Sequence, residues 1–276
     1  MRLMSQIFVA QYRRRADARS TLDAVVGLLG ERVGRHAGFV VLPENAFAAP
    51  DAGPLPPALR DEALTRLAEL ARRRGAYVLT GSWAQESASG AGLDQVAHLL
   101  DPAGEVRAVV RRSVDDRGTT ATGDDFPVVD TEHGRVGVLL GPDFWLVEPP
   151  RIQCLAGAEL LLVAGSTSGV TTDSQHAAVW GIATLNTVGV ALAAGLDAPS
   201  AGGSGIAVPD GFLAWAGTRE SVPGAAWDPD HIRHLRQPDL RFQETLWFGL
   251  WARRPELYGS LTGGQRPTGA TTGTGG

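Results

Sequence analysis

The first third of the chain alternates short apolar runs with longer segments that carry apolar residues at helical spacing. An apolar run predicts a strand at about residues 2–10, and helical spacing predicts a helix at about 18–34. Ser20 or Thr21 is suited to a position near the N-cap of that helix, since hydroxyl side chains accept hydrogen bonds from the first free N–H groups. The apolar run 38–42 then predicts a second strand. The three elements together form one βαβ unit.

A second unit of the same kind follows. Helical spacing predicts a helix over 57–74, and the glycine at 75 is typical of a helix C-terminus. A strand at 76–81 comes next, and two further strands are expected to form a hairpin around residues 101–104.

The second half of the chain repeats this mixture of strands, helices and hairpins. The pattern predicts strands at about 126–130, 134–141, 159–164, 189–194, 205–208 and 212–216, and helices at about 149–156 and 173–187. Pro209, Asp210 and Gly211 suit the turn of the last hairpin. Such an order predicts sheets that pack face to face with helices outside them, within one domain spanning residues 1–258.

The last stretch, residues 259–276, is rich in Gly and Thr and has no apolar periodicity, so we expect a disordered tail. The chain as a whole, with 43% hydrophobic residues and a formal net charge of -5, is typical of a globular protein. The arginine runs 13–15 and 72–74 lie in mixed-charge segments rather than one basic stripe, so nucleic acid is not an expected partner.

No apolar run approaches the roughly 20 residues of a membrane helix, and the first twelve residues lack the pattern of a signal peptide. A single cysteine, Cys154, rules out an intramolecular disulfide framework. We therefore expect a cytoplasmic protein without a membrane partner.

A carboxylate follows the buried strand 38–42, in the segment Leu42-Pro43-Glu44-Asn45. Side chains at the carboxyl ends of strands carry the chemistry of many α/β proteins, so Glu44 is a candidate general base. The simpler alternative is a glutamate at a strand end that pairs with a nearby arginine.

This segment resembles the surroundings of the catalytic glutamate in the nitrilase superfamily of carbon–nitrogen hydrolases. The stretch from Gly104 to Arg112 is similar to that family's hairpin leading to its catalytic lysine, and 134–140 is similar to the approach to its cysteine. Further similarity lies at Asp143, Glu148, Arg151, 157–161, Trp180, 203–204 and 209–211. The resemblance covers about residues 4–217 and implies the α/β fold of that family, a four-layer αββα sandwich.

The resemblance aligns Glu44 with the family's general base, Arg112 with its lysine and Gly141 with its cysteine nucleophile. It also implies that Asp143 and Glu148 bind substrate. The family's thiolate attacks an amide or nitrile carbon, and glycine has no side chain with which to attack.

Arg112 keeps a positive charge that could stabilise an oxyanion, but a guanidinium stays protonated and cannot shuttle a proton. An equally open reading is a surface arginine paired with Asp115 or Asp116. The residue that matches the family's lysine could also be Arg111, one position earlier.

Other nucleophiles are conceivable. Cys154 lies beyond Gly141 on a predicted short helix, where a buried core role is expected for a free cysteine. Asp143 is a weak nucleophile, and Ser166 or Thr167 would need an activating neighbour that the sequence does not identify, so loop or capping hydrogen bonds are expected of them.

No motif calls for a cofactor. His231 and His234 stand three residues apart and could hold a metal, but a solvated helix is the expected role, since zinc sites need three or four protein ligands. Five tryptophans lie in the last hundred residues, which fits either core packing or an interface. Because the resembled family commonly oligomerises, we expect a homo-oligomer, in the simplest case a homodimer.

Two functions follow from these observations. The first is a pseudoenzyme that binds a small-molecule ligand or regulates, because the nucleophile and the lysine are replaced and residues 183–187 depart from the family's Arg-Ala and Glu-Asn signature. The second is an active amidohydrolase on small amides, carbamoyl compounds or nitriles, in which Glu44 activates water and Arg112 holds the oxyanion without a thiol.

Overall fold

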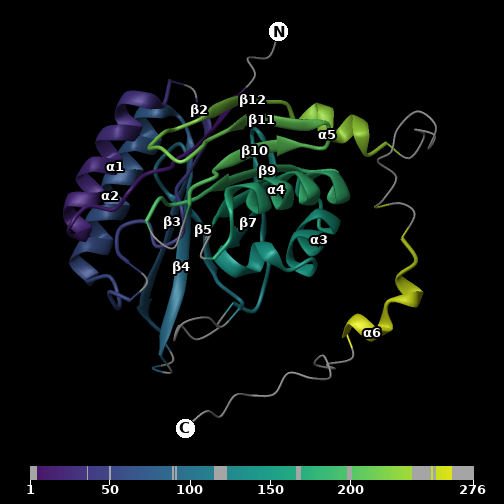
Figure 1. The fold of residues 1–276 in the computed structure, drawn as a ribbon, viewed down its shortest axis with the longest axis horizontal. Coiled ribbons are helices and arrows are strands. Elements are labelled where there is room, and N and C mark those ends of the chain that lie inside the picture. Colours follow the sequence, from purple (N-terminus) through teal and green to yellow (C-terminus); the bar gives the residue numbers. More distant parts are fainter. Residues whose placement is uncertain are drawn as a thin grey trace.

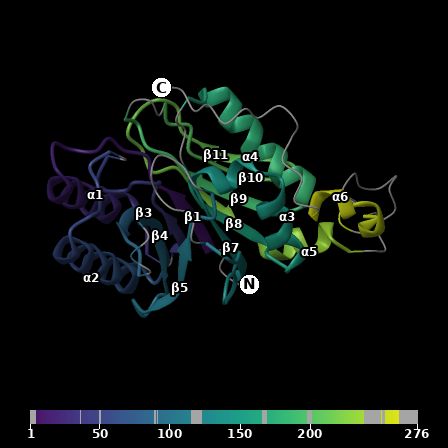
Figure 2. The ribbon, with the colours of Figure 1, turned by 90° about the horizontal axis from the view of Figure 1, so that it is seen from below.

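Two six-stranded β-sheets face each other, and a pair of helices covers the outer face of each sheet (Figures 1 and 2). The computed structural model describes residues 5–35, 37–49, 51–88, 90, 92–114, 123–165, 169–197, 201–237, 250 and 253–262. The predicted four-layer αββα sandwich is confirmed. Among the described residues, no helix is both long and apolar enough to cross a membrane.

The first sheet has the strand order β12-β1-β2-β3-β4-β5. Its strands are β1 (Ser5–Val9), β2 (Ala37–Val41), β3 (Tyr77–Glu86), β4 (Leu93–Leu100), β5 (Val106–Arg111) and β12 (Gly224–Trp227). Strands β1, β2 and β3 pair in parallel, while β4, β5 and β12 join them antiparallel to their neighbours. Strand β5 therefore runs in the same direction as β2.

The second sheet has the order β11-β10-β9-β8-β7-β6. Its strands are β6 (Val128–Thr131), β7 (Gly134–Leu140), β8 (Leu160–Ala164), β9 (Gly189–Ala193), β10 (Gly205–Val208) and β11 (Gly211–Trp215). Strands β7, β8 and β9 are parallel, and hairpins close both edges. The predicted turn at Pro209–Gly211 joins β10 to β11 and is confirmed.

Helices α1 (Ala18–Arg32) and α2 (Pro57–Arg74) lie outside the first sheet, and α3 (Glu148–Leu155) and α4 (Thr172–Asn186) lie outside the second (Figure 2). A 3-10 turn, η1 (Gly141–Trp145), connects β7 to α3. Shorter helical pieces follow at α5 (Pro229–Leu235), η2 (Pro255–Leu257) and α6 (Gly259–Thr262).

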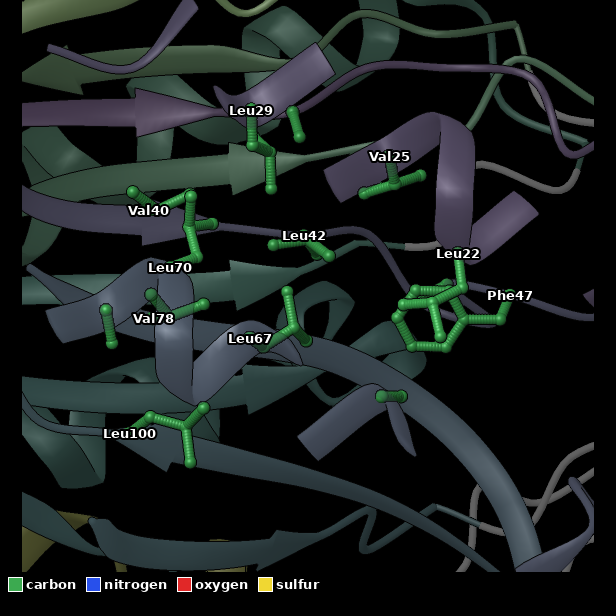
Figure 3. Packing of buried hydrophobic residues seen from close by; sticks show 14 of the residues in the cluster. Leu22, Val25, Leu29, Val40, Leu42, Phe47, Leu67, Leu70, Val78 and Leu100 are labelled. Carbon is green, nitrogen blue, oxygen red and sulfur yellow. The ribbon is translucent and has the colours of Figure 1, made fainter. Parts of the chain in front are cut away.

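The apolar side chains form three clusters, as four layers require. The first fills the space between α1, α2 and the first sheet and includes Leu22, Leu67 and Val78 (Figure 3). The second lies between the two sheets and includes Phe39 and Leu162. The third joins the second sheet to α3 and α4. Burial on both faces explains why the parallel strands read as continuous apolar runs.

Several predicted boundaries were wrong. Asp17, not Ser20 or Thr21, caps α1, because the helix begins at Ala18 and the Asp17 carboxylate accepts the N–H of Ser20. Strand β3 continues through Gly81 to Glu86, five residues beyond its predicted end. Strand β12 was not predicted. Its four residues are too short to show a period and gain their partner only when β1 pairs with them.

The predicted tail begins with the short helix α6, and residues 263–276 lie outside the described part of the chain.

Candidate functional site

The loop after β2 places Glu44 between the two sheets. Leu42 donates its N–H to Leu79 of β3, and the Glu44 N–H donates to the carbonyl of Gly165, just beyond β8. Gly81 makes this close approach possible, because a Cβ there would lie 2.8 Å from Ala46 and nearer still to the Pro43 carbonyl oxygen. The Glu44 side chain is buried.

Neighbouring strands brace this loop with polar side chains. Asn45 has a positive φ of 51°, and its N–H donates to the Ser82 hydroxyl on β3 at 3.3 Å. The side-chain amide of Gln95 on β4 donates to Ser82 Oγ at 2.8 Å and to Asn45 Oδ1 at 3.0 Å. This network holds the backbone that carries Glu44.

Arg112 follows β5 directly, and its side chain reaches Glu44. Its Nη1 donates to Glu44 Oε1 at 3.2 Å, and its Nε donates to the Val114 carbonyl at 2.8 Å. Both side chains of the pair are buried, 6% and 3% exposed for Arg112 and Glu44. The reading of Arg112 as a surface arginine is therefore wrong.

Arg111, the neighbouring candidate, makes a different contact. Arg111 is exposed and pairs with Asp94 at 3.5 Å on β4. Alternate residues of a strand point to opposite faces, which directs Arg111 away from Glu44. Asp115 and Asp116 lie outside the described residues.

Gly141 stands at the end of β7, opposite the Glu44–Arg112 pair. Its φ of +47° lies in the left-handed region. A Cβ at this position would lie 2.6 Å from Cδ and 2.7 Å from Oε2 of Glu44, and closer still to Oε1. The Glu44 carboxylate thus occupies the space that a side chain of residue 141 would need.

Asp143, two residues further on, is buried beneath the loop that carries Arg112. Its carboxylate accepts hydrogen bonds from the Ser113 hydroxyl at 2.7 Å, the Ser113 N–H at 3.0 Å and the Val114 N–H at 3.1 Å. Burial raises the pKa of Asp143, and these hydrogen bonds and the charge of Arg112 oppose the shift. Asp143 therefore positions the Arg112 loop, while contact with a substrate stays a prediction.

Glu148 does not join this buried group. It lies in the first turn of α3 and is exposed to solvent. A carboxylate in the first turn of a helix interacts favourably with the helix dipole. The sequence placed it beside the site, whereas the structure places it on the outer layer.

Among the alternative nucleophiles, Cys154 has the predicted core role. It is 3% exposed, within the cluster of α3, α4 and the second sheet. Burial raises the pKa of its thiol to about 12. Ser166 and Thr167 lie outside the described residues.

The predicted histidine pair does not assemble a metal site within the described chain. His231 contacts the Asp210 carboxylate at 2.5 Å, and His234 is exposed. No group of three or more His, Cys, Asp and Glu side chains able to hold a metal occurs among the residues described.

Three polar residues of the site were missed from the sequence: Ser82, Gln95 and Ser113. Ser113 could have been proposed from the sequence, because it is adjacent to Arg112. Ser82 and Gln95 come from the middle of apolar strands on β3 and β4, and only sheet pairing brings them to Asn45.

Chemically, the assembled group is a carboxylate and a guanidinium in a buried ion pair, next to a glycine and braced by a second carboxylate. Such a group can hold charge and donate or accept hydrogen bonds. It presents no hydroxyl or thiol at residue 141 for covalent attack.

The comparisons with known proteins bear on the family and the fold. The sequence matches the carbon–nitrogen hydrolase family over residues 6–214. A search of the curated proteins finds no significant match.

Similar solved structures include a carbon–nitrogen hydrolase from Helicobacter pylori G27 (TM-score 0.77, 21% identity, covering 94% of this chain and 98% of that one). Saccharomyces cerevisiae Nit3, a member of branch 10 of the nitrilase superfamily, has a TM-score of 0.75 at 18% identity (87% and 97% covered).

A variant of the amidase from Nesterenkonia sp. AN1, in which the acetamide moiety of fluoroacetamide is attached to the active-site cysteine, has a TM-score of 0.75 at 20% identity (94% and 98% covered). These structures share the fold across nearly the whole chain. The sequence match, which spans most of the chain, identifies the protein as a member of the carbon–nitrogen hydrolase family.

Proposed function

We propose that this protein is a pseudoenzyme of the carbon–nitrogen hydrolase family, which has a binding or regulatory role instead of hydrolysis. The observation that carries this proposal is the position of the Glu44 carboxylate, which fills the space beside Gly141 where a nucleophilic side chain would stand. The site has therefore lost both the attacking group and the room for one.

The buried ion pair supports the same proposal. Arg112 Nη1 donates to Glu44 Oε1 at 3.2 Å, and Asp143 fixes the loop that holds Arg112 in place. Any rearrangement that freed the Glu44 carboxylate from the guanidinium would open a buried pair. Such an opening is costly, because the desolvated charges lose their mutual attraction.

A panel of small amides, N-carbamoyl compounds and nitriles tests the proposal by release of ammonia or the carboxylic acid product. Wild-type protein is compared with Glu44→Gln and Cys154→Ala, prepared identically and shown to be folded by circular dichroism. We expect no product above the Glu44→Gln background from any compound.

Turnover that Glu44→Gln abolishes and Cys154→Ala retains would instead establish thiol-free hydrolysis. Turnover lost in Cys154→Ala would assign the nucleophile to that thiol. Either result overturns the pseudoenzyme proposal.

We further propose a cytoplasmic homo-oligomer that binds a small molecule. The single cysteine, buried and unpaired, fits a reducing compartment. Ligands of the site would be found by thermal shift with the same compounds, and a shift absent from Glu44→Gln would locate binding at this pair.

A further inference from the structure

A hollow lined by arginines opens between the two helices that cover the first sheet. Helices α1 and α2 lie side by side there (Figures 1 and 2). Between the second half of α1 and the last turn of α2 the hollow has a volume of about 460 Å³. We call it the arginine hollow; its lining residues are Val26, Gly27, Gly30, Arg35, Arg73 and Arg74. This lining contains no acidic and no aromatic side chain.

Two glycines of α1 leave room for the hollow. A Cβ built on Gly27 or on Gly30 would meet no atom within 4 Å. The two positions are three residues apart and therefore lie on one face of the helix. Glycine is unfavourable inside a helix, so helix formation does not account for either residue. Their effect is to keep this side of the hollow at the level of the backbone.

Arg74 is held at the hollow by a contact between the helices. Its Nη2 donates to the Gly30 carbonyl oxygen of α1, and its side chain is partly buried. Its Nε is buried and has no hydrogen-bond partner within the described part of the chain. A buried N–H without an acceptor is costly. The guanidinium is thus positioned for an acceptor that a ligand can supply.

The arginines of the hollow differ from others on the same helices in having no carboxylate partner. Arg19 pairs with Glu62, and Arg66 pairs with Asp23 and Glu62, which ties α1 to α2. Across the described residues, none of the three arginines that line the hollow forms an ion pair. Their charges are therefore available to a ligand.

The helix dipoles account for only part of this charge. Each helix C-terminus carries roughly half a negative charge, so two helix ends balance about one of the three cations. Glu31 and Glu69 stand four residues before Arg35 and Arg73, but both carboxylates are exposed and neither forms an ion pair with these arginines in the described chain. A local excess of positive charge remains, in a protein whose formal net charge is -5.

We propose that the arginine hollow binds a phosphoryl group, either as free phosphate or as part of a small phosphorylated molecule. A guanidinium presents parallel N–H donors that match two phosphate oxygens. The volume of the hollow lies within the ~300–1,000 Å³ of small-molecule sites. Because no aromatic ring lines it to stack on a base, recognition rests on the phosphoryl group.

The hollow lies at the opposite end of the first sheet from Glu44. Helix α1 leads into β2 at Ala37, and α2 leads into β3 at Tyr77, so the hollow is near the points where these strands begin. Glu44 follows the end of β2. The inference therefore adds a second site and does not depend on whether the Glu44–Arg112 pair hydrolyses a substrate.

Isothermal titration calorimetry of the full-length protein with pyrophosphate, inorganic phosphate and glycerol 3-phosphate tests the inference. Titrations at two temperatures in chloride buffer ensure that a binding enthalpy near zero is not mistaken for absence of binding. We expect pyrophosphate to bind, and Arg73→Gln and Arg74→Gln each to weaken its binding about tenfold. Arg19→Gln is the matched control, because it removes the same charge from an exposed arginine of α1 outside the hollow.

Gly27→Leu tests the hollow without changing its charge. The leucine side chain would enter the open space above Gly27, so the affinity for glycerol 3-phosphate should fall. Circular dichroism confirms that each variant is folded. Tighter binding of glycerol 3-phosphate than of inorganic phosphate assigns the site to a phosphorylated small molecule, and the reverse order assigns it to free phosphate; either supports the site.

Three results would overturn the inference. The first is no binding of any of the three probes. The second is an affinity for pyrophosphate that both Arg73→Gln and Arg74→Gln retain. The third is an equal loss in Arg19→Gln, which would show attraction to the general positive charge of the helices. The hydrolysis assay on wild type reports separately on the pseudoenzyme proposal, so the two can fail independently.

Discussion

Gly141, Glu44 and Arg112 form one physically coupled group, not three independent residues. The absence of a side chain at residue 141 leaves room for the Glu44 carboxylate. The guanidinium of Arg112 then reaches that carboxylate with one nitrogen while another binds the Val114 carbonyl. The fixed fork of N–H donors in arginine allows both contacts at once, which the single ammonium of lysine would not hold in the same geometry.

Removing the arginine should therefore be costly. Arg112→Met leaves the Glu44 charge buried without its guanidinium, and we expect a loss of about 3–5 kcal/mol in the free energy of unfolding. Urea denaturation near neutral pH measures this. In the double variant Glu44→Leu and Arg112→Met, most of the loss should return, because neither charge of the pair is then left buried without its partner.

Arg66→Ala serves as the control, since its pairs with Asp23 and Glu62 are partly exposed and should contribute at most ~1 kcal/mol. A loss at Arg112→Met no larger than at Arg66→Ala would contradict the buried-pair account.

A methyl group at residue 141 should also destabilise the fold. Gly141→Ala puts a Cβ against the Glu44 carboxylate at a left-handed φ, which costs about 1–2 kcal/mol for the backbone alone. Gly27→Ala is the matched control: Gly27 lies inside α1, with open space above it, and should gain roughly 0.5–1 kcal/mol.

Thermal or urea unfolding of both variants gives the comparison. Equal stabilities of Gly141→Ala and wild type would show that Glu44 moves aside freely, and would weaken the argument that it blocks the site.

At the scale of elements, β3 and β4 hold a partly buried histidine against a buried tryptophan. His98 on β4 stacks on Trp83 of β3, with ring centroids 5.2 Å apart. Burial lowers the pKa of His98 to about 4, and the charges of Arg111 and Arg60 act in the same direction. The histidine is therefore held neutral in the folded sheet.

The lowered pKa of His98 makes the stability of the folded protein depend on pH, and the direction of that dependence is defined. Between the ordinary histidine pKa of about 6.5 and the folded value of about 4, the unfolded chain binds the proton that the folded chain excludes. Stability from this group is present above that window and is lost as pH falls through it, by up to about 3 kcal/mol.

Unfolding free energies measured across the window should depend less on pH in His98→Phe than in wild type. His234→Gln, which changes an exposed histidine, is the control. If the unfolding free energy depended on pH in His98→Phe as strongly as in wild type, His98 would not be the source of that dependence.

Some helix boundaries could be predicted from the local sequence pattern alone, and others could not. The positions of α2 and its left-handed C-cap at Gly75 follow from apolar spacing and a glycine. The N-cap of α1 was misplaced because three candidate capping residues, Asp17, Ser20 and Thr21, lie within five positions. The choice among them depends on where the chain leaves β1, which is a tertiary feature.

At the scale of the whole molecule, Cys154 reports on the integrity of the outer layer. Its thiol lies between α3, α4 and the second sheet, and burial raises its pKa to about 12. At about pH 8 the folded protein should therefore react with a disulfide reagent only through unfolding, because the thiolate is the reactive form.

The measurement is the reaction rate against urea concentration, followed by absorbance. It should follow the unfolding transition seen by circular dichroism, and protein fully unfolded in guanidinium gives the full amplitude. Fast reaction without denaturant would show that the α3–α4 layer opens locally.

The sequence by itself determined the layered architecture, because buried parallel strands and amphipathic helices leave periodic patterns that need no partner to be read. It also determined that residue 141 has no nucleophile, since that depends on residue identity alone. Only the tertiary structure decided what fills the space beside Gly141. Glu44, Arg112 and Gly141 come from three different strand ends, and Ser82 and Gln95 come from within β3 and β4. Their contacts exist only after both sheets have formed. The exposure of apolar side chains on α3 and α4 was decided in the same way. Apolar spacing alone does not show which of a helix's apolar sides the fold leaves uncovered.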